Sequence, residues 1–183
     1  ELEATLRVNR LWVAGRGYDS NVTRGGVMKT RFMRRYREAV AAGDTLPRVM
    51  FKFGANHAMR GHSFVNFYDL GNAVHELAEM NGGRAFGLMA LAGRGTQAAG
   101  MDPATFNYVP RPAEEAAWAK PLYDLADPAA WTLYDLRPLR RPLAAGRLGA
   151  VPPLLARVIN GFDAVVILSG SGPSTSLAGP PPF

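Results

Sequence analysis

The sequence predicts an α/β fold, with a mainly parallel sheet of about four strands and helices on its faces. Four apolar, β-prone segments predict the strands: Val49–Phe53, Arg84–Leu91, Trp131–Leu136 and Phe162–Leu168. The first two flank an amphipathic segment, so they predict a strand–helix–strand unit with parallel pairing and a right-handed crossover. We expect one α/β domain over residues 1–170 and a flexible tail rich in Gly, Ser and Pro over residues 171–183.

Hydrophobic periodicity predicts the helices. They are expected at Glu1–Val13, about Gly26 to Ala42, Leu70–Met80, around Trp118 and at Pro152–Asn160. Asp69 precedes the third helix and is its predicted N-cap. The stretch Gly93–Ala113 has little periodicity, so we expect a long loop there, and long loops inside a domain are usually functional.

Composition excludes several classes of site. The chain has 183 residues, which is enough for a hydrophobic core, and a net charge of +6. Its arginines are spread along the chain without interleaved aromatic residues, so nucleic-acid binding is not expected. The absence of cysteine excludes disulfides, thiolate metal sites and a cysteine nucleophile. No apolar run approaches the roughly 20 residues of a membrane-spanning helix.

The stretch RVMFKFGANHAMRGH, residues 48–62, holds the predicted functional site. A predicted buried strand stops at Gly54, and the polar residues Asn56, His57, Arg60 and His62 follow at once. In an open α/β sheet, ligands bind at the carboxyl ends of the strands. The pattern therefore predicts a cleft there, although a polar surface turn with two solvated histidines fits the same residues.

Histidine chemistry at this position leaves two roles open. His57 could be a general base, because the imidazole pKa lies near neutrality. His57 and His62 could instead ligate a metal, although a spacing of five residues in a loop is unspecific. The nearest carboxylates, Asp69 and Glu76, are predicted to be a helix cap and a helix surface residue. His75 is expected to be structural or at the surface.

The order of short motifs resembles the later half of the erythromycin-esterase-like proteins, within the wider grouping that includes the ChaN-like haem-binding proteins. The motifs follow one another over most of residues 20–170: Arg24 to Met28, FKFGANH at 51–57, DLGN at 69–72, FGLMAL at 86–91, YDLR at 134–137 and FDAVVIL at 162–168. Each motif is short, so their order carries the specificity of the resemblance.

The resemblance implies a hydrolase-like domain acting on an ester or lactone. In it, His57 and Arg24 would be catalytic. His57 would support a water-activating base or bind the substrate, and Arg24 would stabilise a developing oxyanion or orient a carboxylate. Asn56, Arg60 and His62 would contact the small-molecule substrate. The alternative from another class is a non-enzymatic module that binds haem or a metal through His57 or His62.

This sequence departs from the family pattern at two places. The family's histidine loop often reads His-Asn-x-His, and Gly54 stands where the first histidine is expected. The family's early Gly-Glu-x-His motif has no counterpart in these 183 residues. The resemblance therefore implies the C-terminal portion of a longer protein, with the N-terminal remainder as its partner. We expect weak ester hydrolysis from the chain alone, since a lone general base typically gives about 10²–10⁴-fold.

Overall fold

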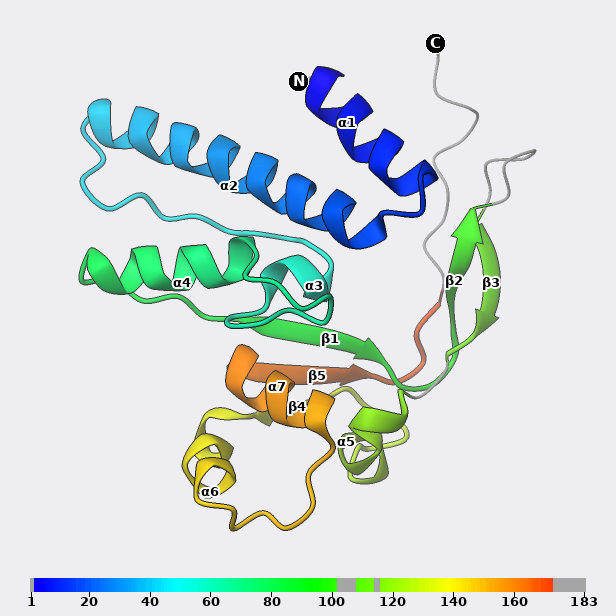
Figure 1. Cartoon of the computed structure of the whole chain (residues 1–183). Helices are drawn as coiled ribbons and strands as arrows, with labels where there is room; N and C mark the ends of the chain where they lie inside the picture. Colours follow the sequence, from blue (N-terminus) through cyan, green and yellow to red (C-terminus); the bar gives the residue numbers. More distant parts are fainter. Residues whose placement is uncertain (1, 102–107, 114–115, 173–183) are drawn as a thin grey trace.

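The computed structural model describes residues 2–101, 108–113 and 116–172. In these residues a layer of long helices lies beside a small sheet, and a separate hairpin projects from one end (Figure 1). The part of the predicted tail from residue 173 onward lies outside the described residues.

The long helices follow the predicted periodicity. α1 (Leu2–Val13), α4 (Leu70–Met80) and α7 (Pro153–Gly161) confirm the predictions to within a residue or two. α2 (Gly17–Ala41) begins nine residues earlier than the predicted Gly26. Asp19 lies in the first turn of α2, where a negative charge favours the helix dipole, and buried Ser20 Oγ donates to Val8 O of α1 at 2.9 Å.

The prediction of a mainly parallel, four-stranded sheet was wrong. Among the described residues the larger sheet has three strands in the order β1 (Leu88–Ala92), β5 (Ala164–Leu168) and β4 (Thr132–Asp135). β1 and β5 pair in parallel with Leu88 opposite Ala164, whereas β4 and β5 are antiparallel with Thr132 opposite Ile167. Parallel pairing requires a crossover that returns the chain to the starting edge of the sheet. α5 (Lys120–Asp124) is too short to carry the chain back across the sheet, so β4 starts at the end where β1 stops.

The predicted strand Val49–Phe53 is not formed, and neither is the strand–helix–strand unit that depended on it. This segment is extended but pairs with no strand within the described part of the chain, and Met50 is 90% exposed. Phe51 packs instead against Phe32 of α2, with 5.1 Å between ring centroids. Strand propensity mostly reflects the packing of side chains on a sheet surface. Phe51 finds this packing on α2, so the segment does not need to join a sheet to bury its aromatic side chain.

Short elements replace the predicted loops and connections. Within the stretch expected to be a loop, β2 (Thr96–Met101) and β3 (Tyr108–Pro112) form an antiparallel pair. The 3₁₀ turn Ala117–Ala119 and α5 (Lys120–Asp124) confirm the short helix expected around Trp118. The connection after β4 contains the 3₁₀ turn Arg137–Leu139 and α6 (Arg140–Ala144).

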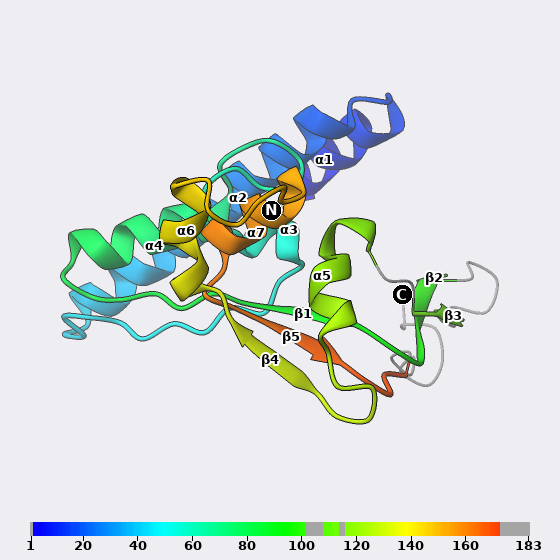
Figure 2. The same cartoon turned by 90° about the horizontal axis from the view of Figure 1, so that it is seen from below.

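The core lies between α7 and the sheet. Figure 2 shows α5, α6 and α7 on one side of the β1–β5–β4 sheet. Leu136, Val158, Phe162 and Val165 have no exposed surface there. Met59 is equally buried and belongs to the same cluster, although it directly follows α3 (Ala55–Ala58). The core therefore holds the segment that carries His57.

Candidate active site

A histidine–carboxylate pair forms the centre of the candidate site. His57 lies in α3, a single helical turn, and Asp69 is the N-cap of α4. His57 Nδ1 is 2.6 Å from Asp69 Oδ2, and Asp69 Oδ1 accepts a hydrogen bond from the Leu70 N–H at 2.7 Å. Asp69 is thus the predicted helix cap and also the partner of His57, a role that its spacing in the sequence did not reveal.

Two glycines let the backbone close around the carboxylate. A Cβ at Gly71 of α4 would lie 2.2 Å from Ala58 C and O, so the absence of a side chain allows α3 to approach α4. A Cβ at Gly25 of α2 would lie 2.7 Å from Asp69 Oδ1. Asp69 consequently has no exposed surface, whereas the His57 side chain keeps 17%.

A cavity of about 490 Å³ opens beside His57. It lies between the extended segment 46–53, the inward side of α4 and residues 83–88. Five Phe and Tyr side chains line it. Four of them, in a row along one side, form what we name the aromatic wall: Phe32, Tyr36, Phe51 and Phe53; the fifth is the exposed Phe86. Consecutive ring centroids lie 5.8 Å apart for Tyr36–Phe32, 5.1 Å for Phe32–Phe51 and 5.8 Å for Phe51–Phe53, and Phe53 lies 6.5 Å from the His57 ring.

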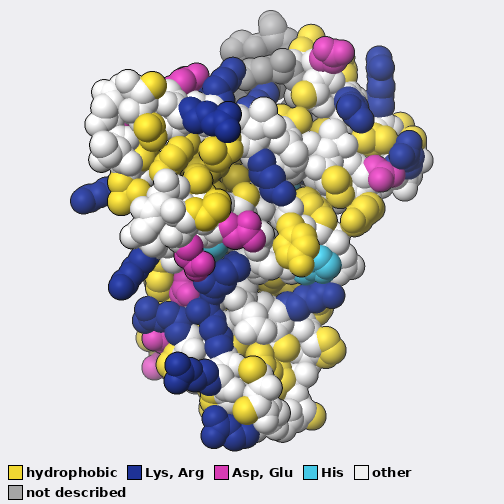
Figure 3. Space-filling view, turned by 60° about the vertical axis from the view of Figure 1, so that its left-hand side comes forward, with side chains coloured by type: hydrophobic (Ala, Val, Ile, Leu, Met, Phe, Trp, Pro, Cys, Tyr) yellow, Lys and Arg dark blue, Asp and Glu magenta, His cyan; other side chains and the backbone are white. Residues whose placement is uncertain are grey.

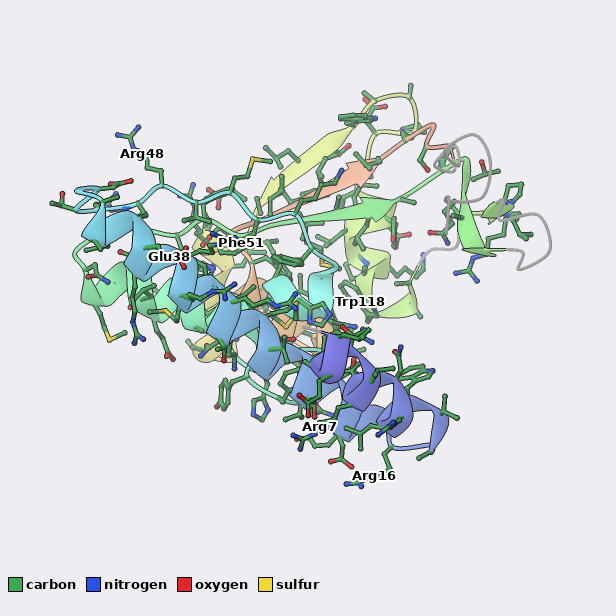
Figure 4. All side chains as sticks on the ribbon, turned by 90° about the horizontal axis from the view of Figure 1, so that it is seen from above. Arg7, Arg16, Glu38, Arg48, Phe51 and Trp118 are labelled. Carbon is green, nitrogen blue, oxygen red and sulfur yellow. The ribbon has the colours of Figure 1, made fainter. Side chains whose placement is uncertain are left out.

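Figure 4 shows how two side chains of the extended segment 46–53 are directed. In Figure 4 the Phe51 side chain lies on the inner side of its segment, towards α2, while the Arg48 side chain points outward. On the face in Figure 3, hydrophobic side chains lie among Lys and Arg side chains in both the upper and the lower part. A largely apolar cavity with few polar groups is the usual form of a small-molecule site.

His75 of α4 lines the same cavity. It is 5% exposed, and no hydrogen bond joins its ring to another described residue. Burial lowers the pKa of His75, and the Arg60 cation lowers it further. The sequence analysis placed this residue at the surface or in a structural role. Residues three and four positions apart lie on the same face of a helix. His75 is four residues after Gly71 and three before Ala78, and both of these line the cavity, so this spacing could have predicted its position.

A buried ion cluster lies at the carboxyl end of α7. Asp163 is 5% exposed and accepts hydrogen bonds from the Gly87 N–H and from Arg140, both at 2.8 Å, while Arg60 Nη2 lies 3.5 Å away. Burial alone would raise the pKa of Asp163, but these hydrogen bonds and the two cations bring the pKa below its usual value. Arg60, a predicted substrate-binding residue, also donates to Asn160 O. Its contacts are therefore those of a residue that holds the fold.

The structure does not bring the other predicted site residues to His57. Arg24 is exposed on α2 and Asn56 is exposed on α3, and neither lines the cavity. His62 is exposed and packs on Tyr68, with 4.4 Å between ring centroids. Since the strand before Gly54 is not formed, His57 does not lie at the carboxyl end of a central strand, as the sequence analysis expected.

The described residues contain no group of three His, Asp or Glu side chains placed to hold a metal ion. Within the same residues, no helix combines the length and apolar character needed to cross a membrane. Comparisons of the chain with protein-family models, with curated proteins and with solved structures give no match. The functional argument therefore depends on the geometry of the site and on the motif resemblance.

Proposed function

We propose that this protein hydrolyses an ester or lactone, with His57 as the general base that activates water. The observation that carries the proposal is the 2.6 Å contact between His57 Nδ1 and the fully buried Asp69 carboxylate. A carboxylate at Nδ1 holds the proton on that nitrogen, which leaves the lone pair of Nε2 free to accept a proton. The cavity beside the ring supplies a place for the substrate.

The reaction follows from this arrangement. Among the described residues the His57 ring hydrogen-bonds to Asp69 alone, so no hydroxyl nucleophile is paired with it. Water would attack the ester carbonyl carbon while Nε2 takes one of its protons. The tetrahedral intermediate would then expel the alkoxide, which receives that proton from Nε2 to leave as an alcohol. Asp69 would stabilise the imidazolium that exists between the two steps.

The resemblance to erythromycin-esterase-like proteins supports the same class of reaction. It assigns the base to His57, the residue that the Asp69 contact orients. It also assigns oxyanion stabilisation to Arg24, which is exposed and does not line the cavity. The geometry therefore supports the histidine part of the expectation and offers no contact for the arginine part.

A panel of small esters and one macrolide lactone tests the proposal. Wild-type protein should hydrolyse at least one member, and His57→Gln should lose about 10²–10⁴-fold in kcat/KM. Asp127→Asn is a suitable control, because Asp127 is exposed and its side chain accepts a hydrogen bond from a local backbone N–H, that of Ala129. A haem titration of the same proteins tests the alternative class. A Soret shift that His57→Ala abolishes, without turnover of any ester, would contradict the hydrolase proposal.

A further inference from the structure

His75 is a buried polar group that the proposed reaction does not use. It is 5% exposed and lines the cavity, yet its ring makes no hydrogen bond to another described residue. Its ring nitrogens remain accessible to solvent, because Ser63 Oγ alone among the described residues is a fully buried side-chain polar atom without a partner. An unpaired ring on the wall of a cavity therefore marks the place where the polar atom of a ligand, or water in its absence, completes the hydrogen bonding.

The aromatic wall defines the rest of the ligand. Its four rings follow one another at 5.1–5.8 Å and end at Phe53, next to His57. Apolar residues of the opposite side, Leu70, Val74 and Leu77 of α4, line the same cavity. A continuous apolar surface of this kind suits an extended hydrocarbon chain, and the hydrophobic gain from burying such a chain grows with its length.

We infer that the cavity binds an ester with a linear apolar acyl chain, which lies along the aromatic wall while its carbonyl oxygen accepts a hydrogen bond from His75. This inference rests on the proposed function for the reaction itself, since the carbonyl carbon must also be within reach of water activated by His57. It makes His75 a substrate-binding residue and gives the oxyanion a donor in place of Arg24.

The charge state of His75 fits this role. Burial and the Arg60 cation lower its pKa, so the ring is neutral at pH 7 and carries one N–H donor. A neutral donor in a largely apolar cavity avoids the cost of burying an unpaired charge, and it still binds a carbonyl oxygen. Arg60 and Arg140 do not line the cavity, because both bond Asp163 and backbone carbonyls. The two arginines that do line it, Arg48 and Arg84, are exposed, whereas His75 is buried.

Binding of methyl ketones tests the inference without any reaction. Calorimetry at pH 8 should give affinities for 2-hexanone, 2-octanone and 2-decanone that rise about fourfold per methylene, the value expected for full burial. Phe51→Ala should reduce this increment, whereas Leu133→Ala, which removes an exposed side chain of β4 outside the cavity, should leave it unchanged. An affinity that does not depend on chain length in the wild type would overturn the inference.

The hydrogen bond to His75 is tested by comparing each ketone with the alkane of equal length. Wild-type protein should bind the ketone about tenfold more tightly, which corresponds to one net hydrogen bond. His75→Leu should abolish this preference, His75→Gln should keep part of it through its amide donor, and Met80→Leu, at an exposed position of the same helix outside the cavity, should keep all of it. Equal binding of ketone and alkane by the wild type would contradict the assigned role of His75.

The outcomes separate this inference from the proposed function. Ketone binding as described, without turnover of any acyl ester, would overturn the hydrolase proposal and leave the binding site intact. Turnover of esters without chain-length dependence would overturn only the inference. Hydrolysis of a soluble octanoyl ester compared with a dioctanoyl lipid in phosphatidylcholine vesicles then shows whether the acyl chain comes from a soluble or a membrane substrate.

Discussion

At the scale of single residues, two buried carboxylates, Asp69 and Asp163, hold the groups around them in place. Asp69 has no exposed surface and divides its oxygens between the Leu70 N–H and His57. Asp163 is 5% exposed and joins the Gly87 N–H, Arg140 and Arg60. Because a buried charge must be paired, each carboxylate fixes the positions of the groups around it. Asp69 does so for the candidate base and Asp163 for the end of α7.

The Asp163 cluster should contribute measurably to stability. Asp163→Ala leaves two partly buried arginines and the Gly87 N–H without their acceptor, so we expect a loss of about 3 kcal/mol in the free energy of unfolding. Asp135 is a matched control, since it also pairs with an arginine, Arg137 at 2.8 Å, but on an exposed surface where such pairs contribute little. Urea denaturation of both variants is the measurement. Equally small losses of unfolding free energy in both variants would show that the ion pairs of Asp163 do not stabilise the fold.

His75 should make stability depend on pH. Its pKa is lowered in the folded protein, so below the ordinary value of 6.5 the unfolded chain binds a proton that the folded chain does not. The free energy of unfolding should therefore have its largest value above about pH 7. It should decrease as the pH drops below 6.5 towards the folded-state pKa. His75→Gln should flatten this part of the profile. Denaturation midpoints from pH 8 to pH 5 check it, and parallel profiles for both proteins would contradict the assignment.

At the scale of elements, the approach of α3 to α4 creates the histidine–carboxylate pair. The two meet at Gly71, where a Cβ would lie 2.2 Å from the backbone of Ala58. On the other side, Gly161 at the end of α7 accepts a hydrogen bond from the Arg60 N–H at 3.0 Å and leaves room for Met59. α3 has four residues and little helical stability of its own, so these contacts hold it in place.

Gly71→Ala should therefore separate His57 from Asp69. The added methyl group has to displace α3, and we expect a loss of about 1–3 kcal/mol in stability together with a loss of ester hydrolysis. Gly26→Ala in α2 is the control, because no atom lies within 4 Å of the Cβ it would add, and it should be neutral or stabilising by up to about 1 kcal/mol. The measurements are kcat/KM for ester hydrolysis and the thermal denaturation midpoint of both variants. Full activity in folded Gly71→Ala protein would show that the contact is not required.

The sequence predicted those elements whose determinants are local. The periodicity of α1, α4 and α7 and the cap at Asp69 depend on residues within a few positions of one another, and the predictions held. The prediction of a strand at Val49–Phe53 was wrong because Phe51 packs on Phe32 of α2 rather than in a sheet. The contact between His57 and Asp69 depends on Gly71 and Ala58 meeting in space, and no spacing in the sequence encodes that meeting.

At the scale of the whole molecule, one core connects the sheet with the site. Met59, next to α3, is packed in the same cluster as Leu136, Val158, Phe162 and Val165. The cavity itself lies where the α2–α4 layer meets the edge of β1, at Leu88. The motif order that suggested a resemblance runs through these same segments, but the sequence could not show that their strands form a small mixed sheet.

The shared core predicts that the site and the sheet unfold together. Leu136→Ala should cost about 2–5 kcal/mol, because Leu136 has no exposed surface, and should shift the unfolding of the secondary structure and the loss of ligand binding by the same amount. Leu133→Ala, at a position 67% exposed, should change stability by no more than about 0.5 kcal/mol. Circular dichroism and ketone binding across a urea titration are the two readouts. Loss of binding well before the loss of secondary structure would indicate a site that is independent of the core.

The most direct test of the central claim is a double-mutant cycle on His57 and Asp69, read as kcat/KM for the best ester of the panel. If Asp69 acts by orienting His57, each single change, His57→Gln and Asp69→Asn, should lose about 10²–10⁴-fold, and the double variant should lose no more than the worse single one. Additive losses, or an Asp69→Asn protein that keeps its activity, would contradict a base whose orientation depends on the 2.6 Å contact.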